Sequence, residues 1–334
     1  MESLMLNPFE AHPVVRGGQL QTLAAFLWPN APHFEADEFI HVPVSGDDQV
    51  ELAVNNPKGE AKANIFMMHG LGGDAQSSYK LRITRKLLPD GYRMLRLNHR
   101  GNGSKVLAAK GIYHSGSTQD VLAVIREIVK RWPDTPLLLV GFSLSGTILL
   151  NLLSWHADEI EKIPEIKGAL SVCSPLDLHR STIAVASRRN KHIDLFFART
   201  LIDQLRKRKL ISDDDIKTKF QKPTLRKVDE YVVAPLGGFR DASDYYDVCS
   251  PIKGLTKIRL PTLILTAADD PIVPPEGILE APRSAAVTVR MERSGGHMGF
   301  LGRNLTPHKD YRWLDHFVQT WANHTLIEVL KKMV

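Results

Sequence analysis

Ser143 is the residue of this chain whose surroundings best fit a catalytic nucleophile. It lies in the segment VGFSLSG (140–146), between a predicted strand and a predicted helix. A sharp turn between a strand and a helix exposes the serine hydroxyl and strains the serine backbone, so the serine needs small neighbours. Gly141 is one such neighbour, whereas Ser145 stands where a second glycine is common. Ser145 is also the alternative nucleophile, although it lies one turn inside the helix.

A serine hydroxyl needs a base that takes its proton during attack and returns it to the leaving group. Among the thirteen histidines, His297 occupies the place where this base is expected. It lies in the glycine-rich segment SGGHMGF (294–300), after the last predicted strand (286–291) and before the C-terminal helix. We therefore predict that His297 is the general base.

The acid that orients the histidine should come from the loop before that last strand, AADDPIVP (267–274). Asp270 fits the spacing Asp-x-x-Val-Pro and is the predicted acid, while Asp269 is the alternative, with a role as a turn cap. A buried carboxylate at this place fixes the imidazole tautomer and stabilises the imidazolium. The chain order Ser143, Asp270, His297 is also the order found in hydrolases with this kind of elbow.

Acyl transfer passes through an oxyanion that preorganised hydrogen-bond donors must stabilise. Backbone N–H groups are the natural donors. Leu144 follows the nucleophile, and Leu71 lies in HGLGG (69–73) at the end of the first predicted parallel strand. We predict that the N–H groups of Leu71 and Leu144 form the oxyanion hole.

From residue 64 onward, short apolar runs alternate with longer amphipathic ones, which is the pattern of a parallel sheet with crossover helices. The predicted strands are nearly continuous in hydrophobicity, as strands buried on both faces are. They cover 65–68, 94–97, 137–140, 169–172 and 262–265. The predicted helices cover 79–88, 118–132 and 144–156. The alternating residues 50–54 predict an antiparallel edge strand ahead of them.

The alternation stops between residue 176 and about residue 250, where the chain is charged and helix-prone. We predict a core made of residues 1–175 and 251–334, with a helical cap inserted at 176–250. The tetrapeptide Val-Cys-Ser-Pro occurs on both sides of this insertion, at 172–175 and 248–251. An inserted cap must leave and rejoin the sheet at nearby points, so we expect these two segments to be spatial neighbours.

Two features of the predicted cap have more than one interpretation. The apolar residues 195–197 and 201–202 could line an acyl pocket or form the small core of the cap itself. The basic run 206–209 could meet an anionic lipid or form a solvated helix face.

The composition excludes several other classes of protein. The chain has 334 residues, a net charge of +6 and two cysteines, Cys173 and Cys249, which are too few for a disulfide framework. Its histidines show no metal-ligand spacing, and it contains neither a dinucleotide-binding nor a Walker motif. No nucleic-acid module accompanies the positive charge. We expect no cofactor, no metal and no nucleic-acid partner, while the oligomeric state stays open.

The first residues also bear on location. Glu2, Pro8 and Glu10 interrupt any apolar stretch in the segment 1–18, so we expect neither a secretory signal nor an integral membrane segment. A cytoplasmic location follows as the expectation.

Nine short segments carry a resemblance to a known family: LQT (20–22), HGLGG (69–73), HRG (99–101), YHSG (113–116), GFSLSG (141–146), SPLDL (174–178), GFRD (238–241), DYY (244–246) and GGHMGFL (295–301). Together they resemble the YheT-like α/β-hydrolases of the AB hydrolase 4 family, from about Arg16 to the C-terminus. The resemblance implies an α/β-hydrolase fold and carboxylic-ester hydrolysis by Ser143, Asp270 and His297. The chain departs from the family pattern at Gln19, where a histidine is frequent, and at Ser145.

The resulting prediction is a carboxylesterase-type serine hydrolase that cleaves short- to medium-chain acyl esters or lipids through an acyl-enzyme on Ser143. An acyltransferase with the same acyl-enzyme is one alternative. A noncatalytic ligand-binding protein with the same fold is the other, because fold alone does not imply function.

Overall fold

The computed structural model describes residues 6–28, 31, 34–105 and 109–331. Its centre is an eight-stranded sheet in the order β1-β2-β4-β3-β5-β6-β7-β8. The strands are β1 (Glu38–Pro43), β2 (Gln49–Asn55), β3 (Ala63–Met68), β4 (Tyr92–Asn98), β5 (Leu137–Phe142), β6 (Ile166–Val172), β7 (Thr262–Ala267) and β8 (Val287–Glu292). Strands β3 to β8 run parallel to one another, while β2 is antiparallel to both β1 and β4. The predicted mostly parallel α/β sheet is confirmed.

The central strands are buried on both faces. Every residue of β3, β5 and β7 is buried, which explains their continuous apolar sequences. Neighbouring residues of β3 supply two different cores, because successive side chains of a strand point to opposite faces. Phe66 lies in the core under one helical layer and Met67 in the core under the other.

The prediction that residues 50–54 form an edge strand is wrong. These residues lie in β2 and are antiparallel to their neighbours, but β1 covers the outer side of β2 with a register from Glu38 opposite Val54 to Pro43 opposite Gln49. Six of the seven residues of β2 are buried. Burial by β1 on one side and β4 on the other makes β2 an interior strand, and β1 is the edge.

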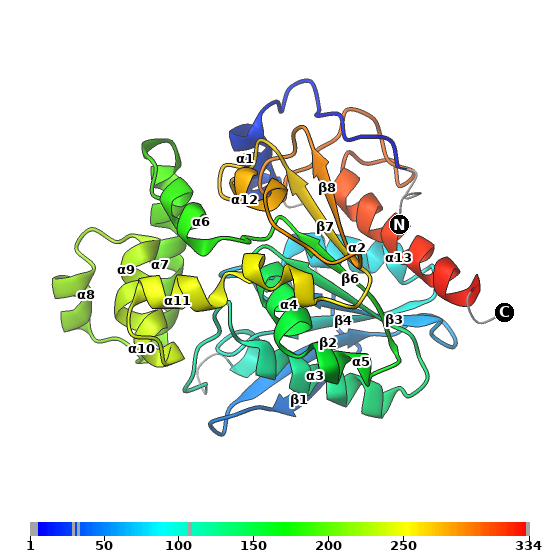
Figure 1. Ribbon diagram of the computed structural model, residues 1–334, viewed down its shortest axis with the longest axis horizontal. Coiled ribbons are helices and arrows are strands. Elements are labelled where there is room, and N and C mark those ends of the chain that lie inside the picture. The colour runs from blue at the N-terminus through cyan, green and yellow to red at the C-terminus, as the bar shows by residue number, and fades with distance from the viewer. Residues whose placement is uncertain (1–5, 29–30, 32–33, 106–108, 332–334) are drawn as a thin grey trace.

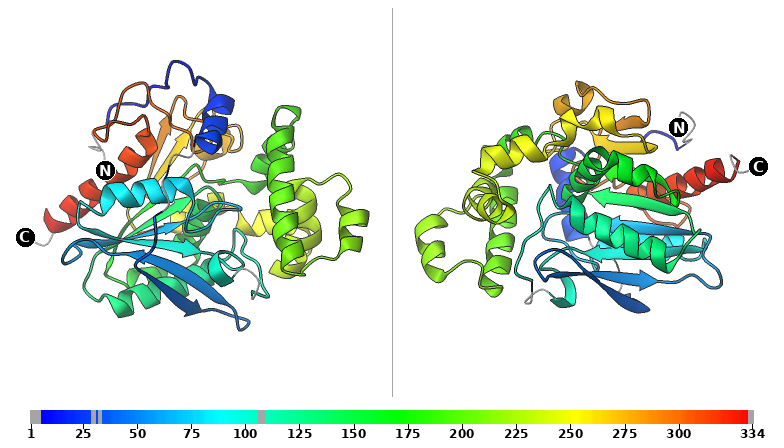
Figure 2. Two further views of the ribbon diagram at one scale, coloured as in Figure 1. Left: turned by 180° about the vertical axis from the view of Figure 1, so that it is seen from behind. Right: turned by 60° about the horizontal axis from the view of Figure 1, so that its bottom comes forward.

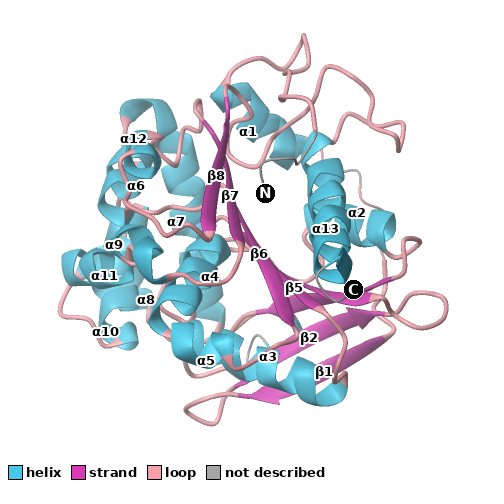
Figure 3. Ribbon diagram, turned by 45° about the vertical axis from the view of Figure 1, so that its right-hand side comes forward, coloured by secondary structure: helices cyan, strands magenta, loops and turns pink. Residues whose placement is uncertain are grey.

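Helices cover both faces of the sheet (Figure 3). One layer contains α2 (Ser78–Leu87) and α13 (Trp313–Lys331). The other contains α3 (Thr118–Arg131), α4 (Leu144–Trp155) and the short α5 (Ala157–Glu161). The loops between strands and helices therefore meet at the carboxyl ends of the parallel strands, where α/β folds place their ligand sites.

Two further helices lie near the β8 end of the sheet, namely α1 (Gly18–Leu27) and α12 (Glu276–Leu279) (Figure 1). Among the described residues, no helix is long and apolar enough to span a bilayer.

Between β6 and β7 the chain forms a helical insertion, residues 178–249, which we call the cap. Its helices are α6 (Leu178–Val185), α7 (Lys191–Lys207), α8 (Asp213–Lys219), α9 (Leu225–Val228), α10 (Ala234–Gly237) and α11 (Ala242–Cys249), with a π-helical turn at Asp229–Val233. Helices α7 to α11 form a block to one side of the sheet (Figures 1 and 2). The buried residues of two small apolar clusters all belong to the cap, so the cap has a core of its own.

The segments that lead into and out of the cap are hydrogen-bonded to each other. Ile252 donates its N–H to the Leu176 carbonyl oxygen at 3.1 Å, and Leu178 donates its N–H to Ser250 Oγ at 2.9 Å. The two cysteines of the repeated tetrapeptide lie in different apolar clusters, Cys173 in the core and Cys249 in the cap. The chain thus leaves and rejoins the sheet at one place, although the two cysteines are not packed in one cluster.

Candidate active site

Ser143 lies in the sharp turn between β5 and α4. Its backbone has φ 51° and ψ −121°, a conformation that costs free energy for any residue with a side chain. The turn is held because Ser143 donates its N–H to the Val172 carbonyl oxygen of β6 at 2.8 Å. A Cβ atom at Gly141 would come within 2.5 Å of the Ser145 carbonyl oxygen, so only glycine fits there. The strained serine and the required glycine are the features that the sequence predicted for a nucleophile.

Gly146, rather than residue 145, is the second glycine that this turn requires. A Cβ atom there would come within 1.6 Å of Ser174 Oγ, which lies just after β6. The serine at position 145 is accommodated because its side chain points away from that contact. Its hydroxyl donates to the His69 carbonyl oxygen and lies 2.8 Å from His99 Nε2.

The hydroxyl of Ser145 is therefore occupied. The residue is fully buried and is not among the residues that line the cavities around Ser143. This geometry argues against Ser145 as the nucleophile. Ser145 instead connects α4 to the residues that follow β3 and β4.

His297 reaches Ser143 from the loop between β8 and α13. Its Nε2 lies 2.8 Å from Ser143 Oγ, and its Nδ1 lies 2.9 Å from Asp270 Oδ2. The side chains of His297 and Asp270 are both buried. The structure thus brings the three predicted residues into one hydrogen-bonded line, serine to histidine to aspartate.

Asp270 is held by two kinds of donor. Its Oδ1 accepts the N–H groups of Ile272 at 2.8 Å and Val273 at 3.0 Å, which leaves Oδ2 for His297. Both carboxylate oxygens therefore have hydrogen-bond partners, which fix the orientation of the carboxylate toward His297. The Asp-x-x-Val-Pro spacing has a physical meaning here, because the Val273 N–H is one of those donors.

Asp269 occupies a different position from Asp270. Its Oδ1 accepts the N–H of Gly296 at 2.9 Å, so it holds the loop that carries the histidine and does not contact the imidazole. Burial raises the pKa of Asp269, and the backbone N–H of Gly296 partly offsets that effect. The structure thus separates the two candidate acids, with Asp270 on the ring of His297 and Asp269 on its loop.

Helix α1 fixes the histidine loop from the other side. Thr22 Oγ1 accepts the backbone N–H of His297 at 2.8 Å and donates to the Gly18 carbonyl oxygen at 2.7 Å. Gln21 Oε1 accepts the N–H of Leu301 at 2.8 Å, and Gln21 Nε2 donates to the Leu301 carbonyl oxygen at 3.1 Å. The segment LQT thus supports the candidate base, a role that the sequence analysis missed because nothing local to residues 20–22 indicates their partner.

Gln19, the other departure from the family pattern, also makes a specific contact. Its Nε2 donates to Asn190 Oδ1 at 2.5 Å, and Asn190 Nδ2 donates to the Pro271 carbonyl oxygen at 2.7 Å. Gln19 therefore connects α1 to the cap and, through Asn190, to the loop of Asp270.

The predicted oxyanion donors lie beside the serine. Leu71 and Leu144 line the same cavity as Ser143 and His297. Within the described part of the chain, the N–H groups of Leu71 and Leu144 have no hydrogen-bond acceptor. Both donors are thus free to bind a ligand oxygen.

Two tyrosines fix the loop that carries Leu71. Gly70 donates its N–H to Tyr79 Oη at 3.2 Å, and Gly72 donates its N–H to Tyr113 Oη at 3.0 Å. The N–H groups on both sides of Leu71 are therefore held by tyrosine hydroxyl groups. Burial raises the pKa of both tyrosines far above the usual value, so their hydroxyl groups stay neutral.

Two buried histidines lie behind this loop. His69 Nδ1 lies 2.8 Å from the Gly70 carbonyl oxygen, and the ring of Tyr113 stacks on that of His99 at 4.7 Å. Burial, together with the nearby Lys80 ammonium, lowers the pKa of His99 to about 3 and that of His69 well below its usual value. Both rings are neutral at physiological pH and serve as packing and hydrogen-bonding groups.

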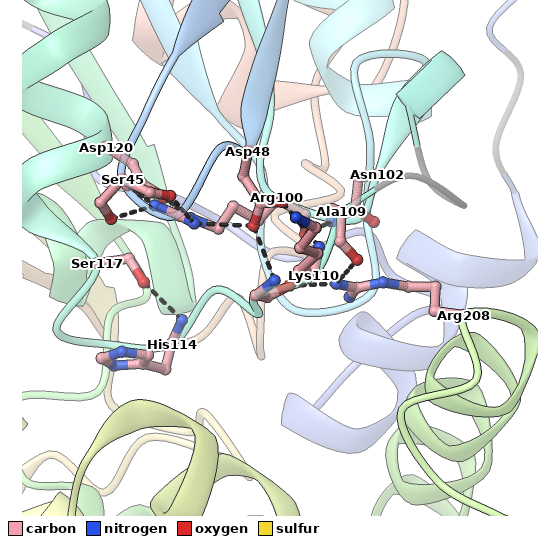
Figure 4. Close-up of polar contacts among 11 residues, drawn as sticks. Ser45, Asp48, Arg100, Asn102, Ala109, Lys110, His114, Ser117, Asp120 and Arg208 are labelled. Atoms are coloured by element: carbon pink, nitrogen blue, oxygen red, sulfur yellow. Dashed lines mark hydrogen bonds and ion pairs between the residues drawn. The ribbon is translucent and has the colours of Figure 1, made fainter.

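Arg100, in the turn after β4, is the centre of a buried ion-pair network (Figure 4). Its guanidinium pairs with Asp120 at 2.6 Å and with Asp48 at 2.9 Å, and it also donates to Ser45. These partners raise its pKa, with the hydrogen bond to Asp120 as the largest cause. These contacts give the turn a scaffold role, because Asp120 lies in the first turn of α3 and Asp48 immediately precedes β2.

Arg208 of the cap contacts the same loop of the core. Its guanidinium donates to the carbonyl oxygens of Ala109 and Gly111, as Figure 4 shows. Burial lowers its pKa. Of the basic run 206–209, this residue is therefore turned toward the core, whereas Arg206 pairs with Asp213 at the surface.

Ser143 and His297 line two cavities. The first, which we call the cap cavity, lies between the core and the cap and has a volume of about 1040 Å³, including space open to solvent. The second, the α1 cavity, has a volume of about 1010 Å³ on the same terms and is bordered by Phe26 of α1 and Phe196 of α7. Phe197 borders both.

The apolar cap residues are divided between the wall of a cavity and the core of the cap. Phe197 and Leu201 line the cap cavity, while Ile202 belongs to the small core of the cap. His114, which also lines the cap cavity, makes a local hydrogen bond, since its Nδ1 accepts the N–H of Gly116 at 3.1 Å.

One group of side chains near the serine has atoms that a metal could bind. Ligand atoms of Cys173, Asp270 and His297 lie within 4.8 Å of one another. Asp270 and His297 are already hydrogen-bonded to each other, and burial raises the pKa of the Cys173 thiol well above its usual value. A metal would need the thiolate and would have to break the aspartate-histidine contact, so these residues fit a triad better than a metal site.

Comparison with known proteins identifies the family. Residues 64–303 match the model of the alpha/beta hydrolase fold. This chain belongs to the α/β-hydrolase family. Among the relatives of this α/β-hydrolase is YheT of Escherichia coli, with 28% identity over 289 residues that cover 82% of this chain and 81% of YheT. The resemblance to YheT-like hydrolases is thereby confirmed.

Two further comparisons extend this one. A monoacylglycerol lipase of Saccharomyces cerevisiae is 28% identical over 253 residues, which cover 72% of the α/β-hydrolase described here but only 56% of the yeast protein. The solved structure of Est1E from Butyrivibrio proteoclasticus, with ferulic acid bound, has a TM-score of 0.53 at 14% identity and covers 86% of this chain and 99% of its own. The latter similarity concerns the fold alone.

Proposed function

We propose that this chain is a serine hydrolase that cleaves carboxylic esters through an acyl-enzyme on Ser143. The observation that carries the proposal is the hydrogen-bonded line of the candidate triad. Ser143 Oγ lies 2.8 Å from His297 Nε2, and His297 Nδ1 lies 2.9 Å from Asp270 Oδ2, at the wall of two cavities. These distances are those that proton transfer from a serine to a histidine requires.

In the first half of the reaction, Ser143 Oγ attacks the ester carbonyl carbon while its proton passes to His297 Nε2. Asp270 stabilises the imidazolium that forms and keeps the Nδ1 proton in place. The tetrahedral intermediate collapses when the bond to the alcohol oxygen breaks, and His297 gives its proton to that oxygen. The alcohol leaves, and the acyl group stays on Ser143.

In the second half, water takes the place of the alcohol. His297 removes a proton from the water as the water attacks the acyl carbon. The bond between Ser143 Oγ and the acyl carbon then breaks, Oγ takes that proton from His297, and the carboxylic acid leaves. In both halves the N–H groups of Leu71 and Leu144 bind the oxyanion. Loss of one such donor typically costs about 3 to 4 kcal/mol of transition-state stabilisation.

The proposed substrates are short- to medium-chain acyl esters or lipids. The cap cavity is lined mainly by apolar side chains, among them Leu178, Val185 and Val232, which suit an acyl chain. The yeast relative carries the name monoacylglycerol lipase, and this supports an ester substrate. We further propose that residues 178–249 act as a cap over the site, with Arg208 and Asn190 as contacts to the core.

The test is hydrolysis of p-nitrophenyl esters of increasing chain length by the wild type and by Ser143→Ala. We expect turnover by the wild type with an optimum chain length, and a loss of activity in the variant of at least about a thousandfold. Addition of a dilute alcohol separates hydrolysis from acyl transfer, because a transferase would release a new ester. An active Ser143→Ala variant would refute the assignment, and a folded but inactive wild type would refute ester hydrolysis.

A further inference from the structure

The wall of the cap cavity that belongs to the cap contains a group of buried polar side chains. Its members come from three separate elements, α6, the π-helical turn and α11, and each is exposed by less than one tenth. They are Ser181, Thr182, Asp229 and Tyr246. The proposed ester chemistry uses none of them.

Three of the four members, Thr182, Tyr246 and Asp229, are joined in one chain of hydrogen bonds. Tyr246 donates its hydroxyl to Asp229 Oδ2 at 2.6 Å, and the Thr182 hydroxyl is hydrogen-bonded to the same tyrosine. Among the described residues, no donor reaches the second carboxylate oxygen, Asp229 Oδ1. A buried carboxyl group thus borders the cavity with one oxygen fixed and the other available.

The surroundings of Asp229 make this free oxygen unusual. The carboxyl group is 8% exposed and its neighbours along the cavity wall include Val228 and Val232. Burial raises the pKa of Asp229 to about 7, against the lowering effect of the hydrogen bond from Tyr246. Because Asp229 lines the cavity, a bound ligand that supplies a donor can complete the hydrogen bonds of its carboxyl group.

The local backbone also marks this site. Asp229 begins a π-helical turn, an uncommon conformation that occurs often at functional sites. The turn lies between α9 and α10, and Tyr246 reaches Asp229 from α11. Two of the family markers belong to this region. SPLDL leads into α6, and DYY lies in α11.

We propose that Asp229 and Tyr246, with Ser181 and Thr182 beside them, bind a hydroxyl group of the substrate. This inference rests on the proposed ester hydrolysis and narrows its substrate class to esters that carry a free hydroxyl. A hydroxyl group needs one acceptor and little desolvation, and Asp229 Oδ1 supplies that acceptor inside an apolar cavity. An ammonium group would need several acceptors and a fully ionised carboxylate, and burial disfavours the ionised form here.

The hydroxyl can belong to the acyl chain or to the alcohol, and matched esters separate the two cases. We suggest ethyl hexanoate as the plain ester, 2-hydroxyethyl hexanoate for a hydroxyl on the alcohol, and ethyl 6-hydroxyhexanoate for a hydroxyl on the acyl chain. The measured quantity is the ratio of kcat/KM for each hydroxylated ester to kcat/KM for the plain one. Titration of Ser143 with a fluorophosphonate counts the correctly folded sites in each variant.

For the wild type we expect one of the two ratios to be about fivefold to tenfold, as for one additional hydrogen bond. Asp229→Leu should bring that ratio to about 1, and Tyr246→Phe should lower it by a smaller factor because Asp229 loses its fixed donor. Glu230→Gln is the matched control. Glu230 follows Asp229 in the π-helical turn and accepts the N–H of Ala242 at 3.1 Å, but it does not line the cavity, so the ratio should stay at the wild-type value.

Two results would overturn the assignment. One is a wild type that cleaves all three esters with similar kcat/KM values, and the other is an Asp229→Leu variant that keeps the wild-type ratio. Absence of any ester turnover by correctly folded wild type would instead refute the proposed ester hydrolysis itself, and the substrate assignment with it. The two failures are therefore distinguishable in one set of assays.

Discussion

The carboxylates of the core and of the cap differ in how their oxygens are held. Asp270 in the core uses both oxygens, one for the two backbone N–H groups of Ile272 and Val273 and the other for His297. Asp229 in the cap has one fixed oxygen and one available oxygen. In the proposed reaction the core group stabilises the imidazolium that forms on His297, whereas the cap group retains hydrogen-bonding capacity for a ligand. The two regions can therefore be tested separately, one through the rate of chemistry and the other through the choice of substrate.

The largest effect that separates the two regions is expected at Asp270. Asp270→Asn keeps the shape of the side chain but favours the wrong tautomer of His297, so kcat should fall by about a thousandfold to ten-thousandfold. The control is Asp269→Asn, which keeps a carbonyl oxygen for the Gly296 N–H and should lose less than about tenfold. Steady-state rates on a p-nitrophenyl ester measure both. A larger loss for Asp269→Asn than for Asp270→Asn would reverse their assignments.

A smaller effect on the same chemistry is expected at Thr22. Thr22→Val removes the hydroxyl that accepts the N–H of His297, so kcat should fall by about tenfold, the equivalent of one hydrogen bond. Thr22→Ser should restore the rate. Thr147→Val is a matched control, because Thr147 is equally buried and donates to the Pro175 carbonyl oxygen away from His297. Equal losses of kcat in the two valine variants would show that Thr22 has only a structural role.

The third effect concerns the cap and is seen in stability rather than in rate. The pKa of Asp229 is about 7 in the folded protein against 3.8 for an ordinary aspartate. Between these pH values the folded protein keeps a proton that the unfolded chain has released, so its free energy of unfolding falls as pH rises, by up to about 1.4 kcal/mol per pH unit.

In the variant Asp229→Asn, an amide that cannot titrate replaces this carboxyl group. The free energy of unfolding of the variant, minus that of the wild type, should therefore rise from about pH 4 to about pH 7 and then level off. Urea unfolding at several pH values from about 5 to about 8 measures this difference. A difference that does not change with pH would contradict the burial of a protonatable carboxyl group at this place.

The contrast between the core and the cap also explains which features the sequence could predict. The strands β3 to β8 and the residues Ser143, Asp270 and His297 were predictable, because strand periodicity, glycine positions and loop order are local patterns along the chain. The edge strand β1 was missed, although Glu38–Pro43 alternates in burial and the turn residues 45–48 separate it from β2. The support of His297 by Thr22 was also missed, because 275 residues separate the partners.

The polar cluster of the cap is the clearest case of a site that sequence patterns do not reveal. Ser181, Thr182, Asp229 and Tyr246 are spread over three elements and belong to no known catalytic spacing. Only the folding of the cap brings Tyr246 to Asp229. The segments SPLDL and DYY carried a family resemblance, but a resemblance does not say which atoms meet.

The most direct test of the account is the site of covalent labelling by a fluorophosphonate, determined by mass spectrometry of the digested protein. We predict one adduct, on Ser143, and none in Ser143→Ala. An adduct on Ser145 would contradict the account, because Ser145 would then be the nucleophile despite its contacts with His69 and His99.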